Sequence, residues 1–303
     1  MRVLTVPNAP GAIFPGTIAG DWRTHRLLVI GGVPFGSAFL SDIDTVTGRA
    51  VSTLPLPNGS AIPWLTVDEA TQRAFVLSDT RPISSRPLAM GGGQVLVVDT
   101  RSGAVIHTIP VAGRPVGAAI DTLTHQVYVA VSGPLSEFCT GGSGANGCSW
   151  WPTQPGRVVV LDGRTGRVRR TVMAGVFPAD LAVDERRRRV LIADQGESDQ
   201  YFGPTMPVLR APLSAPGDVE VLDMASHRTI ERIPLGKQPI IVAMDGQAQR
   251  AFVVDMGGPP VGAPVDPWSW MPPWLRRHLP FVASRPRPRW SPLQVIMVDT
   301  SGP

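Results

Sequence analysis

The chain has 303 residues, of which 43% are hydrophobic and 17% charged, so it has ample apolar material for a core and general disorder is excluded. Glycine and proline number 32 each, a composition that disfavours helices and fits many short strands joined by tight turns. The formal charge is only +4, and no basic stripe with interleaved aromatic residues is present, so we expect no nucleic-acid partner.

Two kinds of predicted β-element alternate along the chain. The first is an apolar strand that ends in aspartate, followed by a short polar turn and a second strand; its aspartates are Asp21, Asp68, Asp121, Asp184 and Asp245. The second is a hairpin in which an aspartate begins the turn; its aspartates are Asp44, Asp99, Asp162, Asp223 and Asp299. Each pair supplies four antiparallel strands, and five such units in series predict an all-β fold, a five-bladed β-propeller.

We expect one domain over residues 1–303, with blades at about 16–56, 63–112, 116–174, 179–235 and 240–303. After Asp299 the sequence ends where a fourth strand is due, and residues 1–7 have the pattern of that strand. The N-terminal strand is therefore expected to close the last blade and complete the ring.

One connection in each repeat carries nearly all of the variation in length. The number of residues from a hairpin aspartate to the next strand aspartate hardly changes. The number from a strand aspartate to the following hairpin aspartate varies widely, from the short interval 21–44 in the first repeat to the long interval 245–299 in the last. Connections between second and third strands emerge on one face of a propeller, here named the insertion face. We expect this face to carry function.

Acidic residues at the ends of the second strands are the first candidate site. Asp79, Asp194 and Asp255 occupy equivalent positions, and Glu197 and Asp199 lie beside Asp194. Converging carboxylates can hold Ca²⁺ or act as acid and base, and Asp194 and Asp255 are the candidate metal ligands. The alternative is that each aspartate caps its own loop. Arg114 and Lys237 should rim the same mouth, where they either meet an anionic ligand or balance these carboxylates.

The two cysteines, Cys139 and Cys148, flank a segment of small residues that can turn back on itself. A disulfide here would stabilise one loop by about 2.5 kcal/mol at most and would imply an oxidising compartment. Metal binding is the rival interpretation, although no histidine lies nearby. Residues 1–7 are too short and too β-like for a signal peptide. Either the signal sequence of an extracytoplasmic protein lies outside this chain, or the protein is cytosolic.

The insertion at 257–292 is rich in tryptophan, proline and arginine. Trp268, Trp270, Trp274, Arg276, Arg277 and Trp290 make up its candidate partner surface. Tryptophan beside arginine is typical of protein interfaces and of peripheral membrane contacts. The alternative is that the loop packs its aromatic side chains back on the propeller.

The run from Val97 to Pro115, with Asp99, Gly103 and its copies, resembles the YVTN-type forty-residue-repeat propellers, which are related to NHL-like and surface-antigen repeats. The resemblance implies a propeller and leaves the activity open. We expect a non-enzymatic binding or assembly module, extracytoplasmic or at a cell surface, that binds a protein or small ligand on the insertion face. The alternative is a metal-dependent hydrolase or lactonase that uses the carboxylates at the channel mouth.

Overall fold

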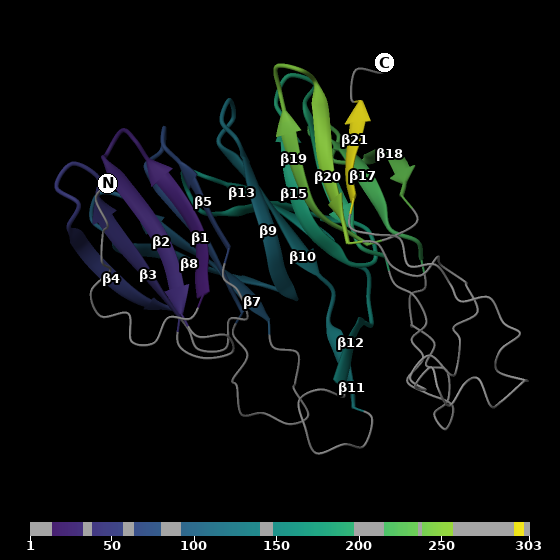
Figure 1. Cartoon of the computed structure of the whole chain (residues 1–303), viewed down its shortest axis with the longest axis horizontal. Coiled ribbons are helices and arrows are strands. Elements are labelled where there is room, and N and C mark those ends of the chain that lie inside the picture. The colour runs from purple at the N-terminus through teal and green to yellow at the C-terminus, as the bar shows by residue number, and fades with distance from the viewer. Residues whose placement is uncertain are drawn as a thin grey trace, which may run out of the picture.

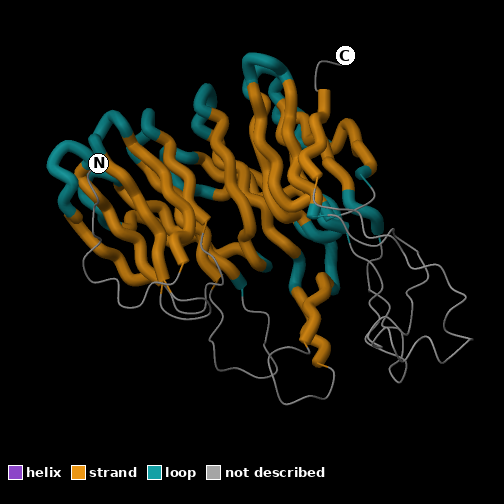
Figure 2. Tube along the Cα trace, viewed as in Figure 1, coloured by secondary structure: helices purple, strands orange, loops and turns teal. Residues whose placement is uncertain are grey.

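The computed structural model describes residues 14–32, 38–56, 64–79, 92–139, 148–196, 215–235, 238–256 and 294–299. Throughout these ranges the regular elements are β-strands, joined by turns and loops (Figure 2). No helix in the described part is long and apolar enough to span a membrane.

Nineteen of the 21 described strands form five antiparallel sheets that follow one another along the chain (Figure 1). Sheet 1 contains β1 (Phe14–Asp21), β2 (Arg26–Gly32), β3 (Ala38–Asp44) and β4 (Ala50–Leu56). Sheet 2 contains β5 (Trp64–Asp68), β6 (Arg73–Asp79), β7 (Gly93–Asp99) and β8 (Val105–Val111). Sheet 3 contains β9 (Arg114–Asp121), β10 (Gln126–Ser132), β13 (Arg157–Asp162) and β14 (Val168–Met173). Sheet 4 contains β15 (Pro178–Asp184), β16 (Arg189–Asp194), β17 (Asp218–Asp223) and β18 (Thr229–Pro234). Sheet 5 contains β19 (Pro239–Asp245), β20 (Arg250–Asp255) and β21 (Gln294–Asp299).

The predicted all-β repeat of four antiparallel strands is thus confirmed in sheets 1 to 4. Sheet 5 has three strands in the described part, and the expected fourth strand, residues 1–7, lies outside it and stays a prediction. The innermost strands β1, β5, β9, β15 and β19 contact one another in that order, whereas no comparable contact joins β19 to β1. The described sheets therefore do not close into the expected ring, and sheets 1 and 5 lie at opposite sides of the view in Figure 1.

The core consists of four apolar layers, one between each pair of consecutive sheets. Strands alternate their side chains between two faces, so a sheet packed on both sides needs apolar residues at nearly every position. Sheet 2 illustrates this, because Phe75 and Val97 pack toward sheet 3 while Val76 and Val98 pack toward sheet 1, and all four are at most 1% exposed. The layer between sheets 3 and 4 contains the fully buried Tyr128, and Val219 and Val253 lie in the layer between sheets 4 and 5.

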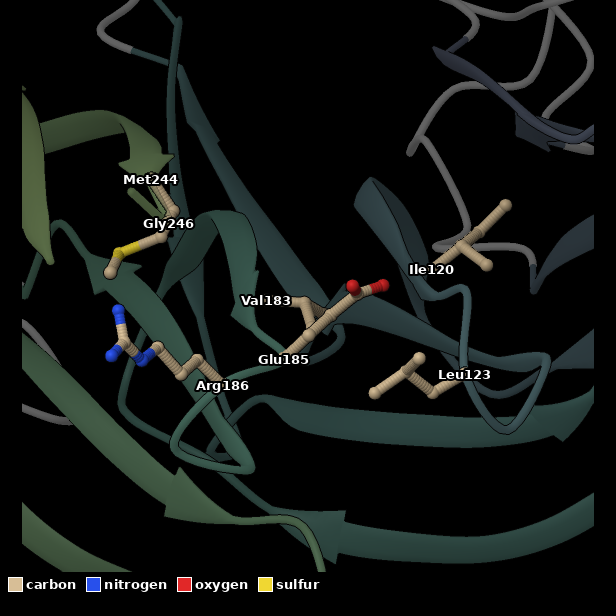
Figure 3. A pocket seen from close by; sticks show the side chains of 7 residues that line it. All are labelled: Ile120, Leu123, Val183, Glu185, Arg186, Met244 and Gly246. Carbon is tan, nitrogen blue, oxygen red and sulfur yellow. The ribbon is translucent and has the colours of Figure 1, made fainter. Parts of the chain in front are cut away.

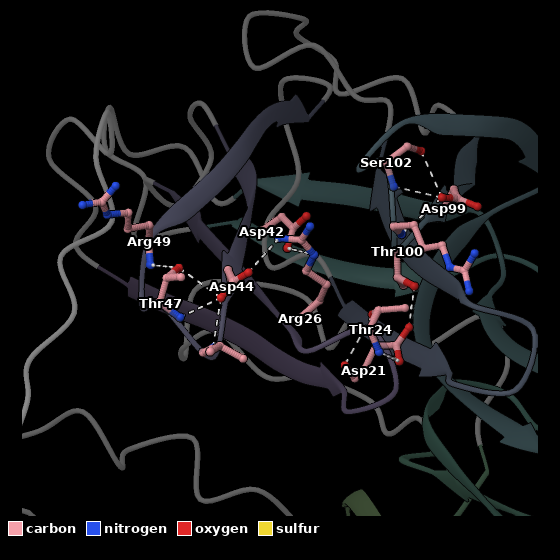
Figure 4. A network of polar contacts seen from close by, with 12 residues as sticks. Asp21, Thr24, Arg26, Asp42, Asp44, Thr47, Arg49, Asp99, Thr100 and Ser102 are labelled. Atoms are coloured by element: carbon pink, nitrogen blue, oxygen red, sulfur yellow. Dashed lines mark hydrogen bonds and ion pairs between the residues drawn. The ribbon is translucent and has the colours of Figure 1, made fainter.

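The strand aspartates fix turns and also link neighbouring sheets. Asp21 accepts the backbone N–H groups of Arg23 and Thr24 through one carboxylate oxygen, and its other oxygen accepts the hydroxyl of Thr100 in sheet 2 (Figure 4). The carboxylate is fully buried. This aspartate therefore has a structural role, both in its own turn and in a link between sheets.

The same link recurs at the next two sheet boundaries. Asp68 faces His125 of sheet 3, with 2.8 Å between Oδ2 and Nδ1, and Asp121 accepts from Arg188 of sheet 4 at 2.6 Å. His125 and Arg188 occupy the same turn position, four residues after the strand aspartate, with φ of 58° and 57°. This left-handed conformation is stabilised because the carbonyl of each residue accepts an N–H from its own sheet's hairpin, from Gly163 and Met224 respectively.

A separate two-stranded ribbon projects from sheet 3 below the other strands in Figure 1. It consists of β11 (Leu135–Cys139) and β12 (Cys148–Pro152), which connect β10 to β13. The register places Cys139 directly opposite Cys148. The side chains of both cysteines lie outside the described part, so the disulfide stays a prediction, with a backbone pairing that favours it.

Candidate functional site

The structure describes a pocket of about 400 Å³ at the tight-turn ends of sheets 3, 4 and 5, on the face opposite the insertion face (Figure 3). Its lining residues are Ile120, Leu123, Val183, Glu185, Arg186, Met244 and Gly246. Three of them directly precede a strand aspartate, so the inner strands of three consecutive sheets converge at the pocket floor.

The pocket combines an apolar floor with one carboxylate side chain, Glu185, and one guanidinium side chain, Arg186. Glu185 is held by Thr122, whose backbone N–H and hydroxyl both donate to Oε1 at 2.6 Å. Arg186, on the other side of the pocket, extends toward Met244 in Figure 3 and is exposed. Such a pocket can bind a small molecule or a peptide side chain that has an apolar body and an anionic group. In the sequence, the signal for this pocket is the adjacent acidic and basic pair Glu185 and Arg186 directly after the strand aspartate Asp184.

On the insertion face, the Asp194 carboxylate binds backbone N–H groups of the loops around it. It accepts backbone N–H groups from Val176 and Phe177, both at 2.6 Å, and from Gly196 at 3.1 Å. Asp194 is 2% exposed, so these bonds replace water at a buried carboxylate. This geometry agrees with the loop-capping alternative.

Asp194 lies in a buried acidic group with Asp218 and Glu220, and the half-exposed Arg232 pairs with the last two. Asp194 lies opposite Asp218 in the register of β16 and β17, and Glu220 follows two residues later on β17. Glu220 accepts from the backbone N–H of Gly175 at 2.8 Å and from Arg232 at 3.0 Å. Burial, together with the negative charge of Asp194, raises the pKa of Asp218 against the opposing effect of Arg232. The loop at Gly175 is therefore tied to sheet 4 by carboxylates from two strands.

The other predicted site residues are only partly described. Asp255 accepts the backbone N–H of Gln238 at 3.1 Å, and the carbonyl of Arg114 accepts the Ser132 hydroxyl at 3.4 Å. Asp79 pairs with Gly93 through the backbone, and its side chain lies outside the described part. Outside it too are Glu197, Asp199, Lys237, Trp268, Trp270, Trp274, Arg276, Arg277 and Trp290. Among the described side chains, no group of three or more His, Cys, Asp or Glu residues could hold a metal ion.

One buried carboxyl between the inner strands was not anticipated. Asp180 on β15 is 5% exposed, and its Oδ2 accepts the backbone N–H of Val242 on β19 at 3.1 Å. On the other side it lies against Gly117 of β9, where an added Cβ would come within 2.8 Å of Oδ1. Asp180 thus links sheets 3, 4 and 5. Burial raises its pKa to about 6, despite the hydrogen bonds from Val242 and Leu181.

This raised pKa predicts a distinct pH dependence of stability. The folded state holds the Asp180 proton more tightly than the unfolded chain, so the contribution is full below about pH 4 and is lost as the pH rises through about 6. Relative to Asp180→Asn, which keeps an acceptor for Val242, the wild type should lose roughly 2 to 3 kcal/mol of unfolding free energy between pH 4 and pH 7. Urea unfolding of both proteins at several pH values measures the difference, and a constant difference would contradict the assignment.

Comparisons with known proteins bear on the fold alone. No protein-family model and no curated protein matches the chain. Among solved structures, the chain is similar to hydrazine synthase of Kuenenia stuttgartiensis, with a TM-score of 0.56 and 14% identity over 90% of this chain and 62% of that one. The Neurospora crassa Pan2 WD40 domain gives a TM-score of 0.42 and 16% identity over 84% of this chain and 76% of that one. A europium-containing methanol dehydrogenase gives 0.49 and 12%, over 80% and 50%.

The chain therefore spans less than two thirds of the length of the hydrazine synthase chain that it matches. At 14% identity this likeness concerns the fold alone. Together with the five consecutive antiparallel sheets, it defines an all-β protein of the propeller type.

Proposed function

We propose that this chain is a non-enzymatic binding module of the YVTN-type repeat class, and that a protein partner contacts its insertion face. The observation that carries the proposal is the one-sided placement of the long connections. The second strands end, and the third strands begin, at one end of the sheets, at the pairs Asp79 with Gly93, Asp194 with Asp218, and Asp255 with Gln294. The ribbon of β11 and β12 extends from this same end (Figure 1).

The ribbon supports a protein partner in particular. It is a two-stranded sheet that pairs with no other described strand, so both of its edges offer backbone N–H and C=O groups. Its β12 strand carries Trp150 and Trp151, a residue type enriched at the centres of interfaces. An unpaired strand edge in a segment rich in aromatic residues is suited to strand addition by an extended peptide.

Two deletions and one control test this proposal. We expect that removing 264–289, or replacing 136–151 by a two-glycine turn, abolishes cross-linking of the same set of proteins in the source cells. The control, Glu185→Ala with Arg186→Ala in the pocket on the opposite face, should retain that set. Retention of every partner by both deletions, or loss of the set in the control, would overturn the proposal.

We further propose an extracytoplasmic setting, because a Cys139–Cys148 bond across the ribbon would be retained only under oxidising conditions. Alkylation of the unreduced protein followed by mass spectrometry should find both thiols blocked. Two freely alkylated cysteines in protein taken from its native compartment would count against this setting.

A further inference from the structure

The two ends of the sheet array present the two halves of one interface. Each sheet has a forward face, which points toward the next sheet along the chain, and a receiving face, which points toward the previous sheet. At each internal boundary the forward face of one sheet packs on the receiving face of the next, and residues at equivalent repeat positions make up each layer. Sheet 5 has a forward face and sheet 1 has a receiving face, and no comparable contact joins their inner strands. The end faces can therefore be compared directly with their buried counterparts.

The forward face of sheet 5 is apolar and exposed. Phe252 and Met297 lie side by side in the register of β20 and β21, and Val295 lies on the same face two residues away. Their exposed fractions are 38%, 54% and 64%, whereas the equivalent residues of sheet 2, which are Phe75, Val97 and Val95, are at most 1% exposed. The residues at this end are therefore of the kind found at an internal interface, but no described sheet covers them.

The receiving face of sheet 1 shows the same contrast. Ile18, three residues before the strand aspartate of β1, is 62% exposed. At the same position in the other sheets, Leu65, Ala118, Leu181 and Val242 are 3 to 7% exposed. Trp22, which is 60% exposed, lies close over Gly20 and extends this apolar surface.

The two end sheets also carry the two partners of the polar link described above, in which a strand aspartate of one sheet meets a turn residue of the next. Asp245 of sheet 5 is exposed, and within the described residues its Oδ1 accepts from the Gln247 and Ala248 N–H groups of its own turn. His25 of sheet 1 is exposed too, with φ of 54°. It occupies the turn position from which His125 reaches Asp68 at 2.8 Å. Within the described residues, neither the Asp245 carboxylate nor the His25 ring makes a hydrogen bond to another sheet.

From these complementary ends we propose that a second copy of this chain docks head to tail, with the sheet 5 face of one copy on the sheet 1 face of the next. Phe252, Val295 and Met297 cover Ile18 of the neighbouring copy, and His25 reaches Asp245 across the boundary. This interface continues the packing found at the four internal boundaries, and because its two sides differ it is heterologous. It is independent of the insertion face.

Light scattering after size-exclusion chromatography tests the assembly. The wild type should exceed the 32.3 kDa of one chain, with a mass that rises with concentration. Ile18→Asp blocks one end and Met297→Asp blocks the other, so each variant alone should remain a monomer. An equimolar mixture should form dimers, because each variant keeps the end that the other lacks. His25→Ala should raise the dissociation constant about 5- to 30-fold.

Val46→Asp is the matched control, since Val46 is 69% exposed in the turn between β3 and β4 rather than on β1, β20 or β21, and this variant should assemble as the wild type does. Circular dichroism and the melting midpoint establish that each variant is folded. If the ring instead closes within one chain, the wild type stays at 32.3 kDa at every concentration, and this result would overturn the proposal. So would a mixture that stays monomeric, or single variants that still dimerise.

Discussion

Replacing Asp121 by alanine is expected to lower the free energy of unfolding by about 3 kcal/mol, because a buried, partnered charge is removed and its partners remain. The carboxylate is fully buried and accepts from the Leu123 N–H, the Thr124 hydroxyl and Arg188 of the next sheet. Burial by itself would raise the pKa of Asp121, but the hydrogen bonds from Thr124 and Arg188 outweigh it and lower the pKa. The carboxylate is therefore charged at neutral pH, and the variant leaves Arg188 without its acceptor.

Asp223→Ala is the control for this result. Asp223 also caps a turn, accepting from the N–H and hydroxyl of Ser226 at 2.7 and 2.6 Å, but no hydrogen bond of its carboxylate in the described part reaches another sheet. Its loss should cost about 1 kcal/mol. Urea titrations at pH 7 measure both variants. Equal costs would show that the link between sheets 3 and 4 adds nothing beyond turn capping.

Asp194→Ala is expected to be destabilising by about 3 kcal/mol in buffer that contains a chelator, because three backbone N–H groups lose a buried acceptor. Asp194→Asn keeps one acceptor oxygen and should cost less. Adding Ca²⁺ or Zn²⁺ should leave the melting midpoint of the wild type unchanged. The measurement is the thermal midpoint of the three proteins with and without metal.

The opposite pattern would restore the metal-dependent hydrolase alternative. In that case Asp194→Ala would be nearly neutral without metal, and Ca²⁺ would raise the midpoint of the wild type but not of the variant. The contact between Asp194 and Asp218 can be tested separately, because the negative charge of Asp194 contributes to the raised pKa of Asp218 and Asp194→Ala should therefore lower that pKa. A carbon-13 titration of the aspartate side chains would detect this change.

Local hydrogen bonding made the strands and turns readable in the sequence. Asp99 accepts from the N–H and hydroxyl of Ser102, and Gly103 takes the positive φ of 69° that ends this turn. Where the glycine is replaced, as by His227 with φ of 56°, the pattern still identified the hairpin because Asp223 was in place. Contacts within five residues set these features, so no knowledge of the rest of the chain was needed.

The links between sheets could not be read in the same way. Asp68 and His125 are 57 residues apart, and Asp121 and Arg188 are 67 apart. Neither pair follows from spacing, because each depends on how two sheets stack. For the same reason Asp180 and the Glu185–Arg186 pocket went unnoticed, since strands from three sheets create both environments.

The sequence by itself determined the strands, their antiparallel order and the single connection that varies in length, because these depend on alternation and on turns of a few residues. The tertiary structure alone decided the angle between consecutive sheets, and with it whether the series of five closes into a ring. The side chains packed in the four layers set this angle. Residues such as Phe252 and Phe75 are identical in the repeat pattern, yet one is exposed and the other buried. What covers a repeated face depends on its neighbour, which the local pattern does not contain.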